Sequence, residues 1–215
     1  MRAGKRALDL ALGGIATVLA APLFLVVAVL VKAGDGGPVF FRQTRVGRNG
    51  VPFRIWKFRT MVQGAEARGS QLTVAMDPRI TWAGQWLRRS RFDELPQLFN
   101  VLAGEMTLVG PRPEVPRFVA LYDADQRRVL ELTPGVTDPA SLAYRNEASL
   151  LAGAPDPERL YAERIMPQKV RMSLEYADRA TLWSDLQLIA GTLGTLFGAG
   201  SASPPHLDRP FPGAH

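Results

Sequence analysis

The sequence predicts an α+β protein that is mostly helical, with one membrane-embedded N-terminal helix, amphipathic helices at the membrane interface and a small β-hairpin. Three observations support this fold class. An uncharged apolar segment runs from Leu10 to Val31, which is long enough for a helix embedded in a bilayer. Two short alternating segments flank the turn signal Asn49-Gly50, a pattern typical of a β-hairpin. Several later segments place apolar residues at helical spacing.

The apolar segment admits two topologies. About 20 apolar residues cross a hydrocarbon core about 30 Å thick, so the length from Leu10 to Val31 suits a spanning helix, and it disfavours a cleaved signal peptide. Pro22 lies inside the segment, where proline removes a backbone donor and clashes with the preceding turn. A straight spanning helix and a re-entrant hairpin that turns near Ala21 therefore both remain open. Basic residues on both flanks fit a hairpin with both ends cytoplasmic.

The remaining elements follow in chain order. Residues 39–43 and 51–58 are expected to form the strands of the hairpin. Residues 81–91 place Trp82 and Trp86 among arginines, which indicates either a helix on a membrane interface or an ordinary amphipathic surface helix. Helices are also expected at 95–102, 115–132, 158–176 and 182–197, a short helix or loop at 61–71, and a turn at 133–139. The domain boundaries are then a membrane-embedded helix at 1–35, a larger second domain at 36–197 and a flexible tail at 198–215.

Composition narrows the chemistry. The 215 residues suffice for one mid-sized domain. Lys and Arg number 26 against 20 Asp and Glu, and only four of the 26 are lysine. This excess of arginine indicates phosphate-bearing partners, such as nucleic acid, anionic lipid or a nucleotide, or else the coding bias of a GC-rich genome. Cysteine is absent and the only histidines are His206 and His215, which leaves carboxylates as the main candidates for catalysis.

Asp93 and Glu94 stand side by side in the segment SRFDELPQ, residues 90–97. Asp93 is expected to cap the helix that follows, with Pro96 in its first turn. The same position also suits chemistry, because a helix N-terminus attracts phosphate and nearby arginines would hold a nucleophilic aspartate ionised. The adjacent acid would bind Mg²⁺. The residues alone leave both interpretations open.

A longer stretch supplies context. The segment DPRITWAGQWLRRSRFDELPQLFNVLAGEMTLVGPRPE, from Asp77 to Glu114, closely resembles the bacterial sugar transferase family. These are monotopic phosphoglycosyl transferases that start glycan assembly on polyprenyl phosphate. Other blocks match the family in order: KRALDL, KFRTM, PGVT, RN and LEYADRATLWSDLQLI. The resemblance runs from about Lys5 to Leu193, and the chain looks like the minimal form of the family.

The resemblance implies an enzyme with a covalent intermediate. Asp93 would attack the sugar-bearing phosphate of a UDP-sugar and expel UMP, and Asp93 and Glu94 would hold Mg²⁺. Polyprenyl (undecaprenyl) phosphate would then accept the phosphosugar, in the first membrane step of exopolysaccharide, lipopolysaccharide or other glycoconjugate synthesis. The apolar segment would be re-entrant, which places the catalytic domain on the cytoplasmic face of the bacterial inner membrane. The implied partners are UDP-sugar, polyprenyl phosphate, membrane lipid and downstream glycosyltransferases, without nucleic acid.

Further residues are expected to bind the substrate. The motif Pro111-Arg112-Pro113 looks like the family's substrate-binding loop, in which flanking prolines fix the direction of the guanidinium; a rigid turn with an exposed arginine is the simpler interpretation. The other candidates are Lys57, Arg59, Arg88 and Arg145. A non-catalytic, membrane-anchored protein that binds anionic lipid or a nucleotide through its arginines is the alternative function. The sequence names no particular sugar.

Three positions differ from the usual family pattern. Ala21 replaces the serine that often precedes the proline of the apolar segment, and Thr17 is expected to offer its hydroxyl to a freed carbonyl instead. Glu105 stands where the family usually has aspartate, and Asp138 stands where it usually has glycine.

Overall fold

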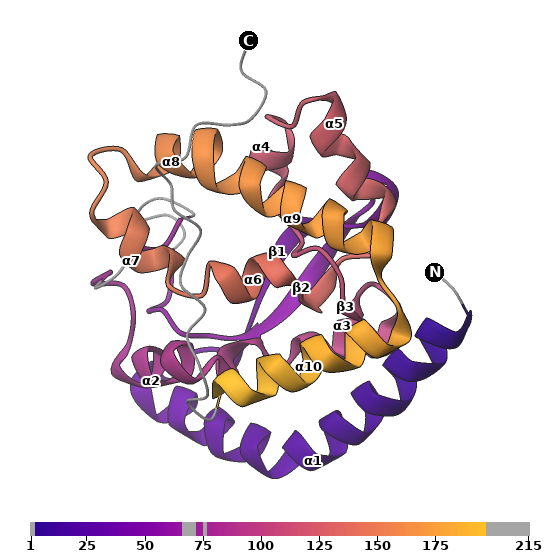
Figure 1. The fold of residues 1–215 in the computed structure, drawn as a ribbon. Helices are drawn as coiled ribbons and strands as arrows, with labels where there is room; N and C mark the ends of the chain where they lie inside the picture. Colours follow the sequence, from indigo (N-terminus) through magenta and orange to yellow (C-terminus); the bar gives the residue numbers. More distant parts are fainter. Residues whose placement is uncertain (1–2, 66–71, 75–76, 197–215) are drawn as a thin grey trace.

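The computed structural model describes residues 3–65, 72–74 and 77–196, so the predicted tail at 198–215 lies outside the described residues. The fold is mostly helical, with a long apolar N-terminal helix and a small antiparallel sheet, as predicted (Figure 1). The elements are α1 (Ala3–Asp35), β1 (Phe40–Val46), η1 (Arg48–Gly50), β2 (Pro52–Phe58), α2 (Trp82–Ser90), η3 (Phe92–Glu94), α3 (Gln97–Ala103), β3 (Thr107–Val109), α4 (Pro116–Val119), α5 (Ala124–Arg127), η4 (Arg128–Glu131), β4 (Gly135–Thr137), α6 (Pro139–Ala143), α7 (Glu147–Ala152), α8 (Pro157–Leu160), the π-helical turn η5 (Tyr161–Ile165), α9 (Met166–Arg179) and α10 (Leu182–Leu196).

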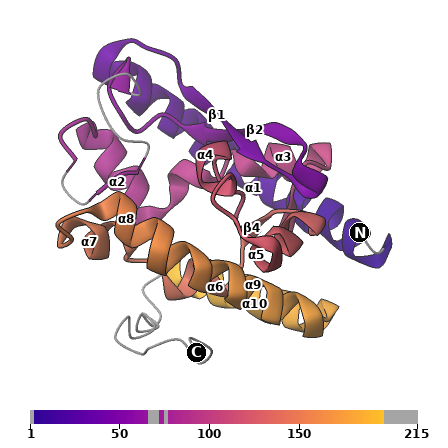
Figure 2. The same ribbon diagram turned by 90° about the horizontal axis from the view of Figure 1, so that it is seen from above.

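The predicted hairpin is present. Strands β1 and β2 pair antiparallel, from Phe40 opposite Phe58 to Val46 opposite Pro52. Asn49 and Gly50 both have positive φ, +57° and +76°, which asparagine and glycine tolerate best. Seen from above, the hairpin and α1 lie along one side of the molecule and α9 along the other (Figure 2).

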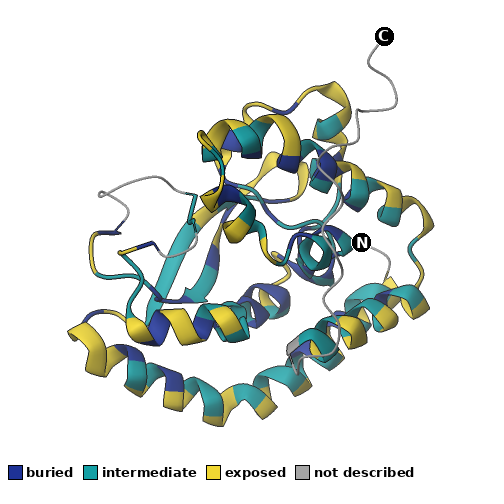
Figure 3. Ribbon diagram, turned by 60° about the vertical axis from the view of Figure 1, so that its left-hand side comes forward, coloured by how far each residue is buried: buried dark blue, intermediate teal, exposed yellow. Residues whose placement is uncertain are grey.

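Helix α1 continues through Pro22 and curves around the rest of the domain rather than breaking there (Figures 1 and 3). Proline is a recognised cause of such bending. The hydroxyl of Thr17 donates to the carbonyl of Gly13 at 2.7 Å. The prediction that this hydroxyl bonds a carbonyl freed by Pro22 was therefore wrong. A hydroxyl that bonds four residues back along a helix also favours bending.

Both ends of α1 are fastened to the same domain. At the first end, the carboxylate of Asp9 accepts hydrogen bonds from Thr107 Oγ1 at 2.7 Å and from the backbone N–H of Leu108 at 2.9 Å. Arg6 donates to the last carbonyls of α3, and Lys5 pairs with Asp185 of α10. At the other end, Arg59 pairs with Asp35 through two hydrogen bonds.

The outer face of α1 is apolar and exposed. Val18 and Leu19 are each 74% exposed, and among the described residues α1 is the one helix long and apolar enough to cross a membrane. Trp82 and Trp86 on α2 and Trp183 on α10 are also exposed. Helix α2 buries its other face through Ala83, Gly84 and Leu87.

Two predicted elements were wrong. The segment predicted as a turn at 133–139 contains β4, which pairs in parallel with β3. A Cβ on Gly135 would lie 2.1 Å from the backbone nitrogen of Gly110, so this pairing requires glycine. The helix predicted at 115–132 is divided into α4, α5 and η4, because Asp123 forms a capping box with Gln126 and starts a new helix there. In residues 61–65, the described part of the segment at 61–71, the chain forms a bridge and a turn.

The core has separate parts that hold the two sides of the molecule. One cluster joins α4, α7, η5 and α9 through residues such as Phe118, Leu151 and Ile165. Another joins α1 to the hairpin and α2 through Val27, Phe58 and Leu87. The space between these clusters forms the candidate site.

Candidate active site

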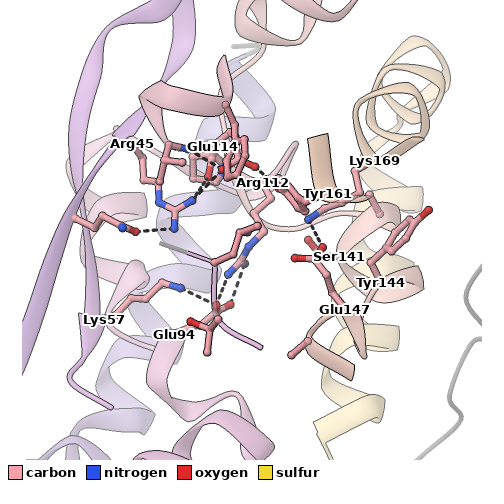
Figure 4. Close-up of a pocket in the computed structure, with 18 of the residues that line it drawn as sticks. Arg45, Lys57, Glu94, Arg112, Glu114, Ser141, Tyr144, Glu147, Tyr161 and Lys169 are labelled. Atoms are coloured by element: carbon pink, nitrogen blue, oxygen red, sulfur yellow. Dashed lines mark hydrogen bonds and ion pairs between the residues drawn. The ribbon is translucent and has the colours of Figure 1, made fainter. Parts of the chain in front are cut away.

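A cavity of about 660 Å³ opens between the hairpin, the Asp93 segment and helices α6, α7 and α9 (Figure 4). Eight of the nine predicted site residues line it: Lys57, Arg88, Asp93, Glu94, Pro111, Arg112, Pro113 and Arg145. The ninth, Arg59, is buried against α1 in its ion pair with Asp35 and does not line the cavity. Residues separated by almost 90 positions in the chain thus converge on one space.

Asp93 lies in the short turn η3 and does not cap the next helix, so the capping interpretation was wrong. Helix α3 begins at Gln97 after Pro96, without a side-chain cap. The turn is preceded by Arg91, which has a left-handed backbone with φ +61°, an uncommon conformation for a residue other than glycine. Asp93 is 7% exposed, and its Oδ1 has no hydrogen-bond partner among the described residues. A buried carboxylate oxygen without a partner is costly and therefore unusual.

Unlike Asp93, Glu94 has hydrogen-bond partners for both of its oxygens, because two cations contact it. Lys57 Nζ donates to Oε1 at 2.9 Å, and Arg112 donates to both oxygens, with Nη1 2.9 Å from Oε2. Figure 4 shows Lys57 and Arg112 reaching Glu94 from different sides. The forked contact from Arg112 is the strongest geometry for such a pair. Glu94 therefore fixes the positions of two cations beside Asp93.

The two carboxylates titrate in opposite directions. Burial and the nearby charge of Glu94 raise the pKa of Asp93 to about 6, although Lys57 and Arg88 oppose this. Burial also disfavours the charge of Glu94, but Arg112 and Lys57 hold its pKa well below the usual range. The pKa of Asp93 rises because burial outweighs the nearby cations. Asp93 is still mainly ionised at neutral pH.

Arg88 and Arg91 also border this pair. The Nε of Arg88 donates to Thr60 Oγ1 at 2.8 Å. This hydrogen bond holds the guanidinium in place and so orients its two terminal nitrogens. Burial lowers the pKa of Arg88, yet a guanidinium stays charged. Arg91 donates to the backbone carbonyl of Arg145 at 2.6 Å and so ties the Asp93 turn to the segment between α6 and α7. The arrangement suits an anionic ligand beside an unpartnered carboxylate.

A family model described as bacterial sugar transferase matches residues 1–199. The chain belongs to the bacterial sugar transferase family. This confirms the resemblance seen in the sequence.

Named relatives extend the comparison. A protein from Aeromonas hydrophila, named UDP-N-acetylgalactosamine-undecaprenyl-phosphate N-acetylgalactosaminephosphotransferase, is 37% identical over 203 residues, 91% of this chain and 44% of the relative. A protein from Escherichia coli K12, named UDP-glucose:undecaprenyl-phosphate glucose-1-phosphate transferase, is 34% identical over 86% of this chain and 38% of its own length. A Rhizobium meliloti protein, named exopolysaccharide production protein ExoY, is 34% identical over 88% of this chain and 83% of its own length. The chain thus spans less than half the length of the first two.

Positions that differ from the family pattern have structural roles. Asp138 accepts hydrogen bonds from the backbone N–H of Ser141 at 2.7 Å and from Ser173 Oγ at 2.5 Å, so it starts α6 and fastens it to α9. Glu105 accepts from Asn100 at 2.7 Å. Asn100 in turn bonds the backbone of β2 at Trp56 and Arg54. Glu105 therefore supports the hairpin, and it is not among the residues that line the cavity.

Several cavity residues were missed at the level of sequence. Arg45 contacts the carbonyl of Pro113 at 3.1 Å and lies 3.5 Å from Glu114, which also accepts a hydrogen bond from Tyr161. Lys169 pairs with Glu147 at 2.7 Å. Glu114 directly follows the Pro-Arg-Pro motif, so its position next to that motif was a sequence signal for a site residue. The others come from distant segments without a motif, so only the fold reveals them.

The donor set fits a divalent ion shared with a ligand. Among the described residues no group of three or more metal-binding side chains occurs. Asp93 lines the cavity and its buried Oδ1 has no hydrogen-bond partner among the described residues, whereas both oxygens of Glu94 accept hydrogen bonds from Lys57 and Arg112. Mg²⁺ is commonly bound through one or two carboxylates together with substrate phosphates. The residues therefore fit Mg²⁺ when a diphosphate supplies further oxygens.

Proposed function

We propose that the protein transfers a phosphosugar from a UDP-sugar to polyprenyl (undecaprenyl) phosphate, giving polyprenyl-diphosphosugar and UMP through a covalent aspartyl intermediate. The observation that carries this proposal is Asp93, a buried carboxylate with an unpartnered oxygen in a cavity bordered by cations. The names of the Aeromonas and Escherichia relatives describe transfer of sugar phosphate to undecaprenyl phosphate. Such transfer depends mainly on positioning and charge neutralisation.

The proposed reaction has two displacements at one phosphorus. Asp93 forms a bond to the phosphorus that carries the sugar, and the bond from that phosphorus to the UMP oxygen breaks. Lys57, Arg88 and Arg112 neutralise the negative charge on the phosphate oxygens. An oxygen of polyprenyl phosphate then attacks the same phosphorus, and the Asp93 carboxylate leaves. The enzyme returns to its first state, and the lipid diphosphosugar is a substrate for downstream glycosyltransferases.

Mg²⁺ is the proposed cofactor, with Asp93 and Glu94 as its predicted ligands. When bound, it would neutralise the diphosphate and polarise the leaving group. Asp93 offers its free oxygen for this purpose. Oε1 of Glu94 accepts hydrogen bonds from both Lys57 and Arg112, whereas Oε2 accepts one, from Arg112, so Oε2 keeps a lone pair for the ion. In the arrangement described, Glu94 acts on the phosphate through the two cations that it positions.

The decisive test of the reaction is release of UMP. Purified protein with Mg²⁺, polyprenyl phosphate and a panel of UDP-sugars is expected to release UMP from at least one donor. Chelation of the divalent ion is expected to stop the release, and fresh Mg²⁺ to restore it. A protein that binds UDP-sugars but releases no UMP from any of them would support the alternative, a non-catalytic binder.

The pH dependence of turnover follows from Asp93. Its pKa is raised to about 6, so protonation removes the nucleophile as the pH falls below that value. We expect kcat/KM to be level above about pH 7 and to fall about tenfold for each unit below pH 6. Steady-state rates measured between pH 5 and 8 check this, with circular dichroism as the control for folding. A profile that is flat down to pH 5 would contradict it.

We propose a re-entrant topology, with the catalytic domain on the cytoplasmic face of the inner membrane. A straight helix of 33 residues would extend about 50 Å and place its ends on opposite sides of the bilayer. Here Asp9 at one end and Asp35 at the other both bind the catalytic domain, while the apolar face between them is exposed. The exposed tryptophans of α2 and α10 suit the membrane interface.

Topology is tested by labelling. Tags fused at residue 1 and residue 215 are both expected on the cytoplasmic side, because α1 enters and leaves the membrane on one face. In intact cells, a membrane-impermeant reagent should label neither tag, and it should label both after lysis. An N-terminal tag labelled from outside would show a spanning helix.

A further inference from the structure

Across the cavity from Glu94 lies a second polar wall that the proposed reaction does not use. Figure 4 shows Ser141, Glu147 and Lys169 there, opposite Lys57, Glu94 and Arg112. Ser141 lies on α6, Glu147 begins α7, and Lys169 lies on α9. All three line the same cavity as Asp93. Resting on the proposed function, we propose that Ser141, Glu147 and Lys169 bind the hydroxyl groups of the transferred sugar and determine which sugar is accepted.

The charge of this wall suits an uncharged ligand. Lys169 Nζ lies 2.7 Å from Glu147 Oε2, with the two side chains 15% and 25% exposed. The pair is neutral as a whole, and its carboxylate would repel phosphate. The proposed phosphate-binding cations belong to the other wall, where Lys57 and Arg112 donate hydrogen bonds to Glu94 and the charge of Arg88 acts on Asp93. A diphosphate therefore belongs beside Asp93, and the far wall remains for a neutral part of the donor.

The wall also has unused hydrogen-bonding groups. Lys169 has three N–H donors, of which one hydrogen bond, to Glu147, is found among the described residues. Glu147 accepts that bond through Oε2, and its second oxygen has lone pairs of its own. Neighbouring donors and acceptors of this kind match the adjacent hydroxyls of a hexose, each of which donates and accepts.

Ser141 provides an independent observation. Its Oγ is buried from solvent and has no hydrogen-bond partner among the described residues. Its backbone is held in place, because its N–H donates to Asp138 at 2.7 Å. A buried hydroxyl without a partner costs free energy. Rotation of the Ser141 side chain toward the cavity that it lines would let a ligand hydroxyl satisfy it. A cavity of about 660 Å³ has the size of ordinary small-ligand sites.

The test compares affinity for a UDP-sugar with affinity for UDP, which lacks the sugar. Calorimetry on Ser141→Ala and Glu147→Gln is expected to show the preferred UDP-sugar binding about tenfold more weakly, with the Kd for UDP changed less than twofold. The free Ser141→Ala protein should melt at or above the wild-type temperature, because no protein hydrogen bond is lost. Glu163→Gln is the matched control, since it breaks an exposed ion pair with Arg159 at 3.0 Å and should change neither Kd.

Turnover gives a second readout. Among UDP-glucose, UDP-galactose and their N-acetylated forms, Glu147→Gln should reduce the ratio of kcat/KM between the best donor and the others. An equal fall in kcat/KM for all donors would overturn the inference and give these residues a structural role. An equal loss of affinity for UDP and for the UDP-sugar would also overturn it, because the residues would then bind the nucleoside diphosphate. Because binding is measured without turnover, an inactive wild type would contradict the proposed function while the affinity ratio still decides this inference.

Discussion

Replacing Asp93 by asparagine should abolish turnover while making the protein more stable. The amide is nearly the same size but cannot form the phosphorus bond, so UMP release should fall by a factor on the order of 10⁴ or more. A donor labelled on the phosphosugar should leave its label on Asp93 in the wild type, trapped before acceptor is added. Peptide mapping after rapid quenching should find the label there and find none in the variant.

The gain in stability comes from the buried charge. Asp93 has a pKa of about 6 in the folded protein against an ordinary aspartate value of 3.8, so the folded state binds the proton more tightly than the unfolded chain. Keeping Asp93 ionised therefore costs roughly 3 kcal/mol at pH 7. This cost is full above about pH 6 and disappears as the pH falls below 3.8. Asparagine removes it at neutral pH.

Thermal unfolding of both proteins across pH checks this pair of effects. The variant should be the more stable at pH 7.5, and its advantage should shrink as the pH is lowered toward 4.5. Asp178→Asn, an exposed position on α9, is the matched control and should change stability by less than about 0.5 kcal/mol. Unchanged UMP release by Asp93→Asn would remove Asp93 from the chemistry. A variant less stable than the wild type at pH 7.5 would show that the cations, rather than burial, dominate at this site.

Local signals predicted most of the fold. The Asn49-Gly50 turn and the alternating strands around it gave the hairpin correctly, because hairpin pairing depends on neighbouring residues. The apolar run gave α1, and the helical spacing gave α2, α3, α9 and α10 approximately. The parallel pairing of β3 with β4 was missed, since three-residue strands show no alternation and their pairing is non-local. The capping box at Asp123 was legible in the sequence but was overlooked.

The site residues were predicted mainly from sequence motifs, and less well from the chemistry of the individual residues. The family resemblance identified Asp93, Glu94 and Arg112, which do converge on the cavity. The raised pKa of Asp93 was not predicted, because it depends on burial, which cannot be read from a segment rich in arginine. The left-handed backbone at Arg91 has no signal there either. The wall of Ser141, Glu147 and Lys169 has no local signature. It exists only because α6, α7 and α9 pack together.

Replacing Arg112 by methionine should both inactivate and destabilise the protein. Methionine fills similar space but removes the fork that holds Glu94. Glu94 would then remain largely buried with Lys57 as its cation. We expect a loss of about 3 kcal/mol, the lower end for breaking a buried ion pair, because the Arg112 side chain is 26% exposed. Turnover should fall by a factor on the order of 10² to 10³, because a positioned charge near the phosphate is lost.

The double variant Glu94→Gln with Arg112→Met separates these two effects. Replacing Glu94 by glutamine removes the carboxylate charge that Arg112 balanced but also takes the carboxylate from Lys57, so the double variant should regain part of the stability that Arg112→Met alone has lost. It should stay inactive, because the phosphate still lacks the guanidinium.

Arg112→Lys should keep the charge but lose the forked geometry. Its stability and its turnover should both lie between those of the wild type and those of Arg112→Met. As a matched control, Arg159→Met on the exposed pair with Glu163 should cost less than about 1 kcal/mol. A double variant as unstable as Arg112→Met would mean that the loss comes from the packing of Arg112 in the Pro111–Pro113 loop. The ion pair between Arg112 and Glu94 would then not be the cause of the lost stability.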